Sequence, residues 1–381
     1  MNKSRLFLLG AGKIGRMITE LLTSSGDYEV TVGDHDEGAL QKLAHADIRT
    51  LKVDINDPIG FRQAISGNDM VISAGPYTMT PLVAAAAKDV GAHYFDMTED
   101  VASTRAVQAL AVNASTVFMP QCGLAPGFIG IVGYDLAKRF DELHNLQMRV
   151  GALPQFPTNV LKYNLTWSTD GLINEYCNPC EAIVDGRVHE VAPLEGYERF
   201  ALDGVDYEAF NTSGGLGTLC ETLVGKVRNM DYKTVRYPGH RDICHLLVND
   251  LLLKHRRHIL KDVLENAIPV TLQDVVLVFV TASGMREGML TQESFATKIY
   301  GHNVNGRPWS AIQITTAAGI CAAVDLVRNG KLPQQGFVGQ EQVVLTDFLE
   351  NRFGTHYTMG NMLSQAPSET KRAVATSAVA A

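Results

Sequence analysis

A short apolar run that leads into a glycine loop constrains the fold of this chain more than any other feature. Residues 6–9 are apolar, and Gly10, Gly12 and Gly15 follow in the spacing G-x-G-x-x-G at the start of a predicted helix over 13–24. A strand, a tight glycine turn and a helix in this order are typical of a dinucleotide-binding unit. The first glycine permits the turn, the second lets the backbone approach a pyrophosphate, and the third lets the helix pack on the strand. An ordinary strand-to-helix turn is the alternative.

The first 122 residues alternate short apolar runs with amphipathic stretches, as strands and helices do when they form a parallel sheet. Strands are predicted at 6–9, 29–32, 48–53, 70–73, 93–96 and 116–119. The clearest helix signal between them has Thr80 as N-cap, Pro81 at the first helical position and Gly91 just past the end. The pattern predicts an α/β fold whose first domain, residues 1–122, is a Rossmann-type doubly wound parallel sheet.

The pattern changes after Cys122, where predicted strands arrive in runs instead of alternating with helices. Strands are predicted at 146–153, 163–168, 181–184, 233–237, 274–283 and 293–302, with helices at 126–140, 216–227, 241–253 and 257–265. This predicts a second α/β domain over 123–309 with a mixed or antiparallel sheet. A helix over 310–327, rich in small residues, opens a segment over 310–363 that we expect to return to the first domain. Residues 364–381 lack a periodic apolar face, so we expect a disordered tail.

Composition narrows the partners and the location. The net charge of −8 and the pI near 5.8 argue against nucleic acid, which needs a clustered basic face. Six cysteines scattered over 381 residues are typical of a reducing compartment, so we expect a cytoplasmic protein. Neither apolar stretch near the glycine loop or at 124–137 reaches the length of a membrane span. The spacing of Cys177 and Cys180 lacks a second ligand pair, so no metal is expected.

The acidic residue at the end of the second predicted strand bears on the choice of dinucleotide. Asp34 follows Gly10 by 24 positions, where a carboxylate accepts hydrogen bonds from the adenosine ribose hydroxyls and repels a 2′-phosphate. No Lys or Arg follows directly, so the sequence favours NAD and makes NADP the weaker candidate. Asp36 could replace Asp34, which would then only begin a turn. The full predicted cofactor site is Gly10, Gly12, Lys13, Ile14, Gly15, Asp34, Ser73, Gly75 and Pro76, the last three on the nicotinamide side.

Four blocks in the second half of the chain are specific enough to suggest a family. They are 122–127 (CGLAPG), 151–154 (GALP), 165–168 (LTWS) and 234–240 (TVRYPGH). In this order and spacing they resemble the saccharopine dehydrogenase-like family, over residues 3 to about 353. The resemblance implies a dinucleotide domain joined to an α/β substrate domain, usually in a homodimer. It also implies an oxidoreductase that acts on the CH–NH group of a lysine-like amino acid.

Two departures from that family bear on the substrate. Asp170 precedes a glycine where the saccharopine-acting members tend to carry a basic residue, and 211–215 (NTSGG) stands where they place an arginine. Both departures remove positive charge, which favours free lysine, with its single carboxylate, over saccharopine with three. The expected reaction is oxidative deamination at the side-chain carbon to a semialdehyde that cyclises. Saccharopine or another opine-type secondary amine is an alternative substrate, and a non-catalytic dinucleotide sensor is an alternative function.

Six residues are candidates for the chemistry of this reaction, and each has a structural alternative. Arg236 is predicted to bind the substrate carboxylate, or else to form an interdomain salt bridge. His240 is a candidate proton acceptor or hydrogen-bond partner of the substrate, or else a helix N-cap. Asp96 is a candidate catalytic group at a strand end that could receive the substrate ammonium, or a helix cap. Tyr77 offers a phenol beside the nicotinamide, or simply packs.

The remaining two candidates would shape the substrate pocket. Trp167 is predicted to form a wall against the aliphatic stem of the substrate, and its alternative is a core position on an inward-facing strand. Asp170 is predicted to bind the distal ammonium, and its alternative is the N-cap of a short helix.

Overall fold

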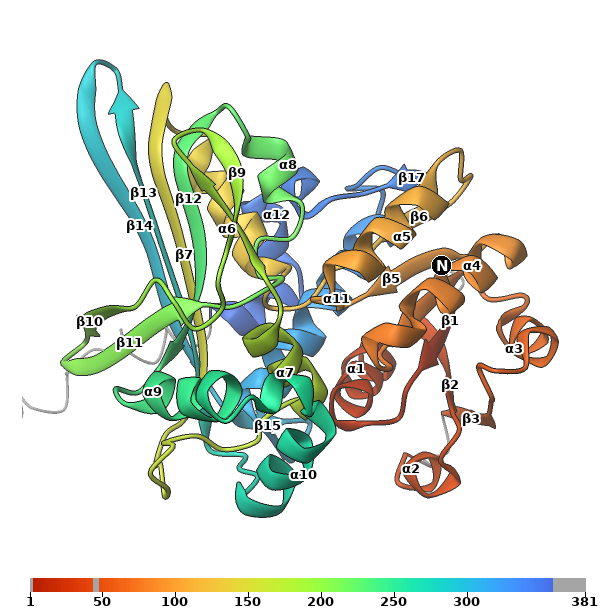
Figure 1. Cartoon of the computed structure of the whole chain (residues 1–381). Helices are drawn as coiled ribbons and strands as arrows, with labels where there is room; N and C mark the ends of the chain where they lie inside the picture. Colours follow the sequence, from red (N-terminus) through yellow and green to blue (C-terminus); the bar gives the residue numbers. More distant parts are fainter. Residues whose placement is uncertain (1–2, 44–47, 359–381) are drawn as a thin grey trace, which may run out of the picture.

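The chain folds into two sheets that face each other across a layer of helices (Figure 1). The computed structural model describes residues 3–43 and 48–358. The expected disordered tail therefore lies outside the described residues. Because the first sheet is wholly parallel and the second is mixed, the predicted fold class is confirmed.

The first sheet has seven parallel strands in the order β17-β6-β5-β4-β1-β2-β3. Its strands are β1 (Ser4–Leu9), β2 (Tyr28–Asp34), β3 (Arg49–Lys52), β4 (Met70–Ser73), β5 (His93–Asp96), β6 (Val117–Met119) and β17 (Gly336–Phe337). The helices between them are α1 (Lys13–Ser24), α2 (Glu37–Gln41), α3 (Pro58–Ile65), α4 (Thr80–Val90) and α5 (Val101–Ala111). The order reverses beside β1, and in open parallel sheets a ligand binds at such a point, beyond the carboxyl ends of the strands.

Two details of this lobe were not predicted, namely how α4 begins and that the returning C-terminal segment adds a seventh strand, β17. Thr80 is the first residue of α4 and does not cap it, because the 3-10 turn η1 (Tyr77–Met79) runs directly into the helix. Gly91 ends α4 with a left-handed backbone, as predicted. The last strand, β17, comes from the C-terminal segment and pairs with β6, so the chain returns to the first sheet after building the second.

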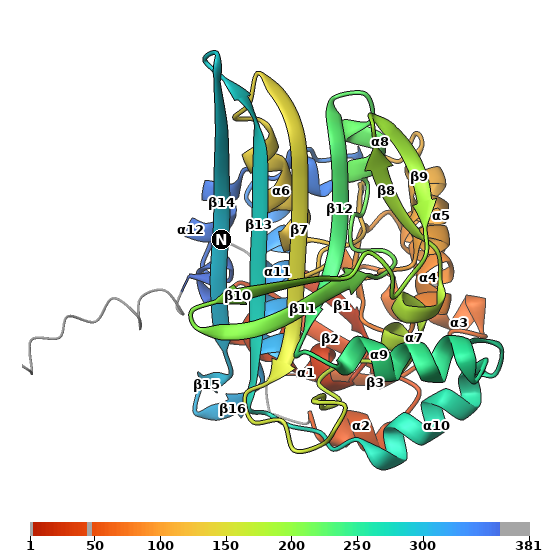
Figure 2. The same cartoon turned by 60° about the vertical axis from the view of Figure 1, so that its left-hand side comes forward.

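The second sheet is dominated by long strands that lie side by side (Figure 2). Its strands are β7 (Glu142–Pro154), β8 (Cys180–Val184), β9 (Arg187–Val191), β10 (Glu198–Leu202), β11 (Val205–Asn211), β12 (Val227–Arg236), β13 (Asp274–Arg286) and β14 (Met289–Tyr300). The main path runs β10-β11-β12-β7-β13-β14, with β12 and β7 parallel and its other pairs antiparallel. A separate hairpin joins β15 (His302–Val304) and β16 (Arg307–Trp309). The strand predicted at 163–168 is wrong, because that segment is irregular.

Helices and short turns complete the second lobe. They are α6 (Phe128–Ala137), α7 (Thr169–Cys177), α8 (Leu219–Leu223), α9 (His240–His245), η2 (Leu246–Asp250), η3 (Leu253–His255), α10 (Arg257–Ala267), α11 (Ala311–Arg328), η4 (Gln340–Gln342), α12 (Leu345–Glu350) and η5 (Gly354–Tyr357). The predicted helix at 216–227 is shorter than expected, because β12 already begins at Val227. The helix predicted at 241–253 is interrupted, since α9 gives way to the π-helical turn η2.

Helix α11 joins the two lobes. It packs against α1 and β5 of the first lobe and against β13 of the second, and its apolar side chains belong to one core that spans both sheets. A Cβ on Gly319 would lie 2.7 Å from the Cys122 carbonyl oxygen, so the close backbone approach expected from the small residues is confirmed. By length and composition α11 could cross a membrane, but 89% of it is buried inside the protein, as a core helix is. The two lobes are therefore held together by a shared core.

Candidate functional site

The glycine loop forms a cradle at the carboxyl end of β1. Gly10 has a φ of +110°, and a Cβ on Gly15 would lie only 1.9 Å from the Gly10 carbonyl oxygen. Gly12 caps α1 and faces open space, with no atom within 4 Å of its Cβ position. The turn and the packing thus need glycine at two positions, and the third leaves the helix N-terminus accessible. This geometry fits a dinucleotide diphosphate, which the free N–H groups of α1 from Lys13 onward would hold.

Asp34 ties the end of β2 to the same loop. Its Oδ2 accepts a hydrogen bond from the Ala11 N–H at 2.7 Å, and its Oδ1 accepts one from the Asp36 N–H at 2.9 Å. His35 Nδ1 also lies 3.0 Å from Oδ1. The carboxylate therefore stands beside the loop, in the position where it would meet the ribose hydroxyls of a bound dinucleotide.

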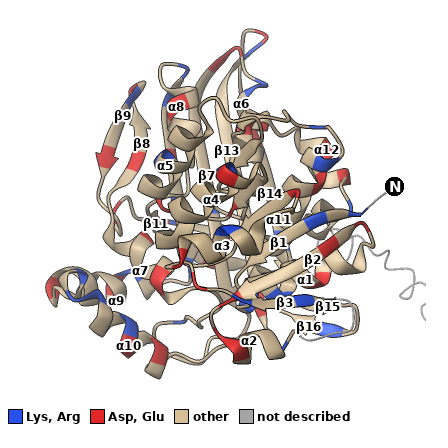
Figure 3. Cartoon of the chain, turned by 90° about the vertical axis from the view of Figure 1, so that its right-hand side faces the viewer, with Lys and Arg blue, Asp and Glu red and all other residues tan. Residues whose placement is uncertain are grey.

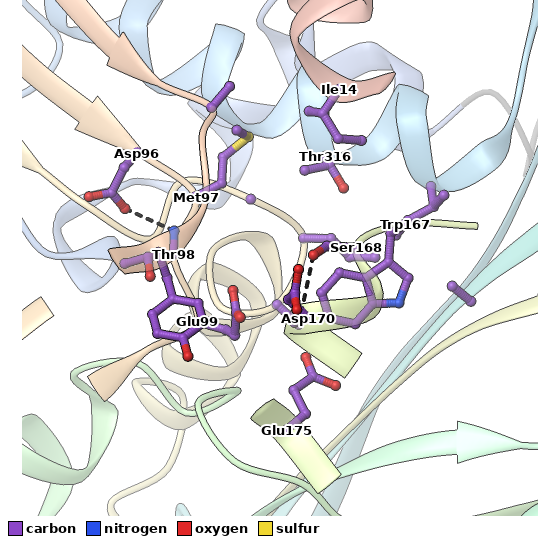
Figure 4. A pocket seen from close by; sticks show the side chains of 18 of the residues that line it. Ile14, Asp96, Met97, Thr98, Glu99, Trp167, Ser168, Asp170, Glu175 and Thr316 are labelled. Carbon is purple, nitrogen blue, oxygen red and sulfur yellow. Dashed lines mark hydrogen bonds between the residues drawn. The ribbon is translucent and has the colours of Figure 1, made fainter. Parts of the chain in front are cut away.

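A cavity of about 340 Å³ opens between the two lobes, next to this cradle (Figure 4). Nine of the predicted site residues line it: Ile14, Ser73, Gly75, Pro76, Tyr77, Asp96, Trp167, Asp170 and Arg236. One face of β12 supplies Tyr232, Thr234 and Arg236, which alternate along the strand and so point to the same side. The cavity therefore connects the predicted nicotinamide side, at the ends of β4 and β5, with the second sheet.

Arg236 is a buried cation at the sheet side of this cavity, with 3% of its surface exposed. Its Nε donates to the Tyr176 hydroxyl at 2.9 Å, and its Nη1 donates to the Val235 carbonyl at 2.8 Å. Its guanidinium also lies 5.1 Å from the centre of the Tyr163 ring. Over residues 3–43 and 48–358 no carboxylate lies within ion-pair distance, so the interdomain salt bridge is not formed. A buried guanidinium without a counter-charge is suited to an anionic ligand.

His240 does not reach the cavity, so its predicted role as proton acceptor is wrong. It is wholly buried among aromatic rings; its Nε2 contacts the Tyr176 hydroxyl at 3.0 Å and its Nδ1 contacts the Leu161 carbonyl at 2.9 Å. Burial, and after it the charge of Arg236, lowers the pKa of His240 to about 3, which keeps the ring neutral. His240 contacts the Tyr176 hydroxyl, which in turn contacts Arg236.

Asp96 borders the cavity, but its carboxylate serves the backbone around it. Oδ1 accepts from the Thr98 N–H at 2.9 Å (Figure 4) and from the Gln121 N–H at 3.0 Å, while Oδ2 accepts from the Tyr94 hydroxyl at 2.8 Å. These bonds join the ends of β5 and β6. The predicted ammonium-binding role is therefore corrected to a structural one, and the helix cap is also excluded, because Asp100 caps α5.

Asp170 stands at the rim, and the predicted ammonium-binding role is corrected here too. Its carboxylate pairs with Lys261 of α10 at 2.6 Å, and 55% of its side chain is exposed. Helix α10 contains residues of both signs of charge along its length (Figure 3). The cap of α7 is Ser168, whose hydroxyl accepts from the Gly171 N–H, so the alternative proposed for Asp170 is also wrong.

Trp167 and Tyr77 do lie where they were predicted, on the cavity wall. The Trp167 indole N–H donates to the Tyr163 hydroxyl at 3.2 Å, and its ring stands so close to α7 that a Cβ on Gly171 would lie 2.4 Å from it. Tyr77 begins the turn η1 beside the predicted nicotinamide side. Trp167 thus walls the cavity from an irregular segment and not from the strand that the sequence suggested.

The sequence-based candidates missed two glutamates in the cavity, Glu99 and Glu175 (Figure 4). Burial raises the pKa of Glu99 to about 7 and, together with the charge of Glu99, raises the pKa of Glu175 to about 8 against the opposing charge of Arg236. Two sequence features could have pointed to these glutamates. Glu99 lies three residues beyond the end of a predicted strand, and Glu175 follows Gly171 by four residues, which places both on one face of a helix. Only the fold shows that the two side chains meet in one cavity.

Comparison with known proteins identifies the family to which this chain belongs. The saccharopine dehydrogenase NADP binding domain matches residues 6–119, and the saccharopine dehydrogenase C-terminal domain matches residues 123–354. The chain belongs to the saccharopine dehydrogenase family. This confirms the resemblance found in the four sequence blocks.

Individual members of the saccharopine dehydrogenase family are distant from this chain. It is 25% identical over 197 residues to a saccharopine dehydrogenase [NADP(+), L-glutamate-forming] of Saccharomyces cerevisiae, covering 49% of this chain and 44% of that protein. It is 22% identical over 251 residues to the mitochondrial alpha-aminoadipic semialdehyde synthase of Rattus norvegicus, covering 60% of this chain and 27% of that protein. The matched region thus spans less than half of these relatives.

A solved structure supports the fold. The apo saccharopine dehydrogenase (L-Glu forming) from Saccharomyces cerevisiae superimposes with a TM-score of 0.75 at 18% identity, covering 92% of this chain and 98% of that one. At this identity the likeness concerns the fold alone.

Proposed function

We propose that this protein is a nicotinamide-dinucleotide-dependent oxidoreductase that oxidises the side-chain amine of a lysine-like amino acid, as a lysine 6-dehydrogenase does. One observation carries the proposal: Arg236 is buried without an ion pair at one end of a cavity whose other end is the predicted nicotinamide side. A substrate carboxylate would supply the missing counter-charge, and the length of the cavity would direct the distal amine toward the cofactor.

The charge of the cavity favours a diamino acid. Among the described lining residues Arg236 is the only Lys or Arg, whereas four carboxyl groups line the same space: Asp96, Glu99, Asp170 and Glu175. Saccharopine brings three carboxylates and would need further cations, whereas lysine brings one carboxylate and two amines. The names of the relatives make saccharopine, or another secondary amine of the opine type, the second candidate substrate.

The reaction requires a proton acceptor, and Glu99 is the candidate. Lysine, oxidised dinucleotide and water would give the semialdehyde, reduced dinucleotide, ammonium and one proton, and the semialdehyde would then cyclise. When bound, the oxidised nicotinamide supplies the hydride acceptor. The reacting ammonium must first lose a proton, and the half-buried Glu99 carboxyl, with a pKa of about 7, is suited to take it near neutral pH.

The cofactor we propose is NAD. Asp34 places a carboxylate beside the glycine loop, where it would accept from ribose hydroxyls and repel a 2′-phosphate. The matching domain and the yeast relative are named for NADP, which is the alternative.

Initial rates of nicotinamide reduction test the proposal. Lysine, ornithine and saccharopine are each offered with NAD and with NADP, and we expect the highest kcat/KM with lysine and NAD. Turnover with saccharopine alone would show that saccharopine, and not lysine, is the substrate. Tight dinucleotide binding without turnover of any of the three would support the non-catalytic sensor instead.

A further inference from the structure

A second charged residue stands near Arg236 and makes this end of the cavity bipolar. Glu175 is one residue before Tyr176, whose hydroxyl holds Arg236, and both Glu175 and Arg236 line the cavity. Each charge shifts the pKa of the other group, yet their side chains are not within ion-pair distance of 4.0 Å. The guanidinium and the Glu175 carboxyl therefore face one space without forming an ion pair, and an ammonium bound beside the carboxyl would favour its ionised form.

The Glu175 carboxyl has no hydrogen-bond or ion-pair partner among the described residues. It is buried, and within the described ranges no side chain or backbone N–H donates a hydrogen bond to it. Buried carboxylates are ordinarily paired with a cation or hydrogen-bonded, so this one lacks a partner that a ligand could provide. Its elevated pKa is the expected consequence of that lack, because burial and the charge of Glu99 both disfavour the anion.

Glu99 is a second carboxyl that lines the cavity and acts on Glu175. A Cβ on Gly171 would be 3.2 Å from Glu99 Oε1, and Gly171 precedes Glu175 by one helical turn on α7. The Glu99 carboxyl therefore lies over the turn of α7 that precedes Glu175, on the face that residues 171 and 175 share. Glu99 follows Asp96 at the end of β5, on the cofactor side, so Glu175 is the carboxyl nearer to Arg236.

We propose that Arg236 and Glu175 together form a clamp for the head group of an α-amino acid, in which Arg236 binds the carboxylate and Glu175 binds the α-ammonium. An α-amino acid presents these two charges on neighbouring atoms, in the same polarity as the cavity wall. The clamp rests on the proposed function, because it orients the distal amine away from the head group and toward Glu99 and the nicotinamide side. It also predicts which ligands bind when no reaction occurs.

Three ligands distinguish recognition of the α-amino acid head group by the clamp from a general preference of the cavity for charged ligands. L-Lysine carries both the α-amine and the distal amine, L-norleucine lacks the distal amine, and 6-aminohexanoate lacks the α-amine. Binding of each to the complex with reduced cofactor is measured by calorimetry for the wild-type protein, for Glu175→Gln and for the exposed control Glu190→Gln. Thermal melts check that every variant is folded.

The expected result is a loss of affinity that follows the α-amine. Glu175→Gln should weaken lysine and norleucine by about 10-fold or more, as expected for a charged hydrogen bond, and should leave 6-aminohexanoate nearly unchanged. Equal weakening of all three ligands, or of none, would overturn the clamp. Because this measurement needs no turnover, it is distinct from the rate assay: lysine that binds through Glu175 but is never oxidised would sink the proposed activity and leave the clamp standing.

Discussion

The Tyr176 hydroxyl lies between Arg236 Nε, at 2.9 Å, and His240 Nε2, at 3.0 Å. A tyrosine at the end of α7 therefore fixes the cation at the end of β12, and a neutral buried histidine fixes the tyrosine. This chain of contacts holds the guanidinium at the cavity wall without neutralising it. Two residues of the TVRYPGH block, Arg236 and His240, are thus linked through Tyr176 of α7.

Removal of that cation should impair substrate binding selectively. Arg236→Ala should raise the KM for lysine by on the order of 100-fold, since a charge-assisted bond to the carboxylate is lost, and should leave the Kd for NAD unchanged. Steady-state kinetics and a cofactor titration measure the two constants. Arg228→Ala, at an exposed position on the same strand, is the control. An unfolded Arg236→Ala protein would point to a structural role, and Arg236→Lys, which keeps the charge, would then decide between the two roles.

Gly171 should tolerate no side chain, because the cavity wall closes over it. A methyl group there would meet the Trp167 ring at 2.4 Å and crowd Glu99. We expect Gly171→Ala to reduce kcat/KM for lysine by 10-fold or more while the protein stays folded. Melting temperature and kinetics are measured together. An unchanged kcat/KM would mean that this wall does not contact the substrate.

Cofactor preference should depend on Asp34. The double change Asp34→Ser and His35→Arg removes the carboxylate and adds a cation for a 2′-phosphate. The ratio of kcat/KM for NADP to that for NAD should rise at least 10-fold. A ratio that does not change, or a wild-type protein that already prefers NADP, would show that the ribose contact lies elsewhere.

Glu175 should make stability depend on pH in a defined direction. Its pKa is about 8 in the folded protein against an ordinary value of 4.5, so the unfolded chain ionises first as pH rises. Stability from this group is full below pH 4.5 and is lost as pH rises to about 8. Glu175→Gln removes this pH-dependent loss of stability. The Tm of the variant minus the Tm of the wild type should therefore increase by at least about 3 °C from pH 5 to pH 9.

The control for this measurement is Glu190→Gln, which should follow wild type at every pH. The charged and titratable groups that face Glu175 from the packed elements are Glu99, Tyr163, Tyr176, Cys180, Tyr232 and Arg236. A difference between Glu175→Gln and wild type that stays constant over this pH range would contradict the raised pKa.

The sequence predicted local features well where a single segment determines them. The glycine loop, the strands of the first lobe and the helix α11 follow from spacing and periodicity, and the four blocks identified the family. The small residues of α11 also predicted its close packing, seen at Gly319. These features depend on neighbours in the chain, which a sequence displays directly.

Features that depend on distant segments were predicted less well. His240 looked like a proton acceptor by residue type, but the fold buries it behind Tyr176. Asp170 was predicted to bind an ammonium, but it forms an ion pair with Lys261 of another helix. Glu99 and Glu175 were assigned no role from the sequence, because only the folded structure brings them into one cavity. The homodimer and the cytoplasmic location stay predictions.

We propose that a single buried guanidinium, that of Arg236, binds the carboxylate of a lysine-like amino acid and so directs the distal amine toward the nicotinamide. A crystal structure of the ternary complex with reduced cofactor and L-lysine tests it most directly. We expect the carboxylate within hydrogen-bond distance of Arg236 and the distal amine near Glu99 and the nicotinamide ring. A lysine whose carboxylate lies away from Arg236, or whose chain runs in the opposite direction, would contradict it.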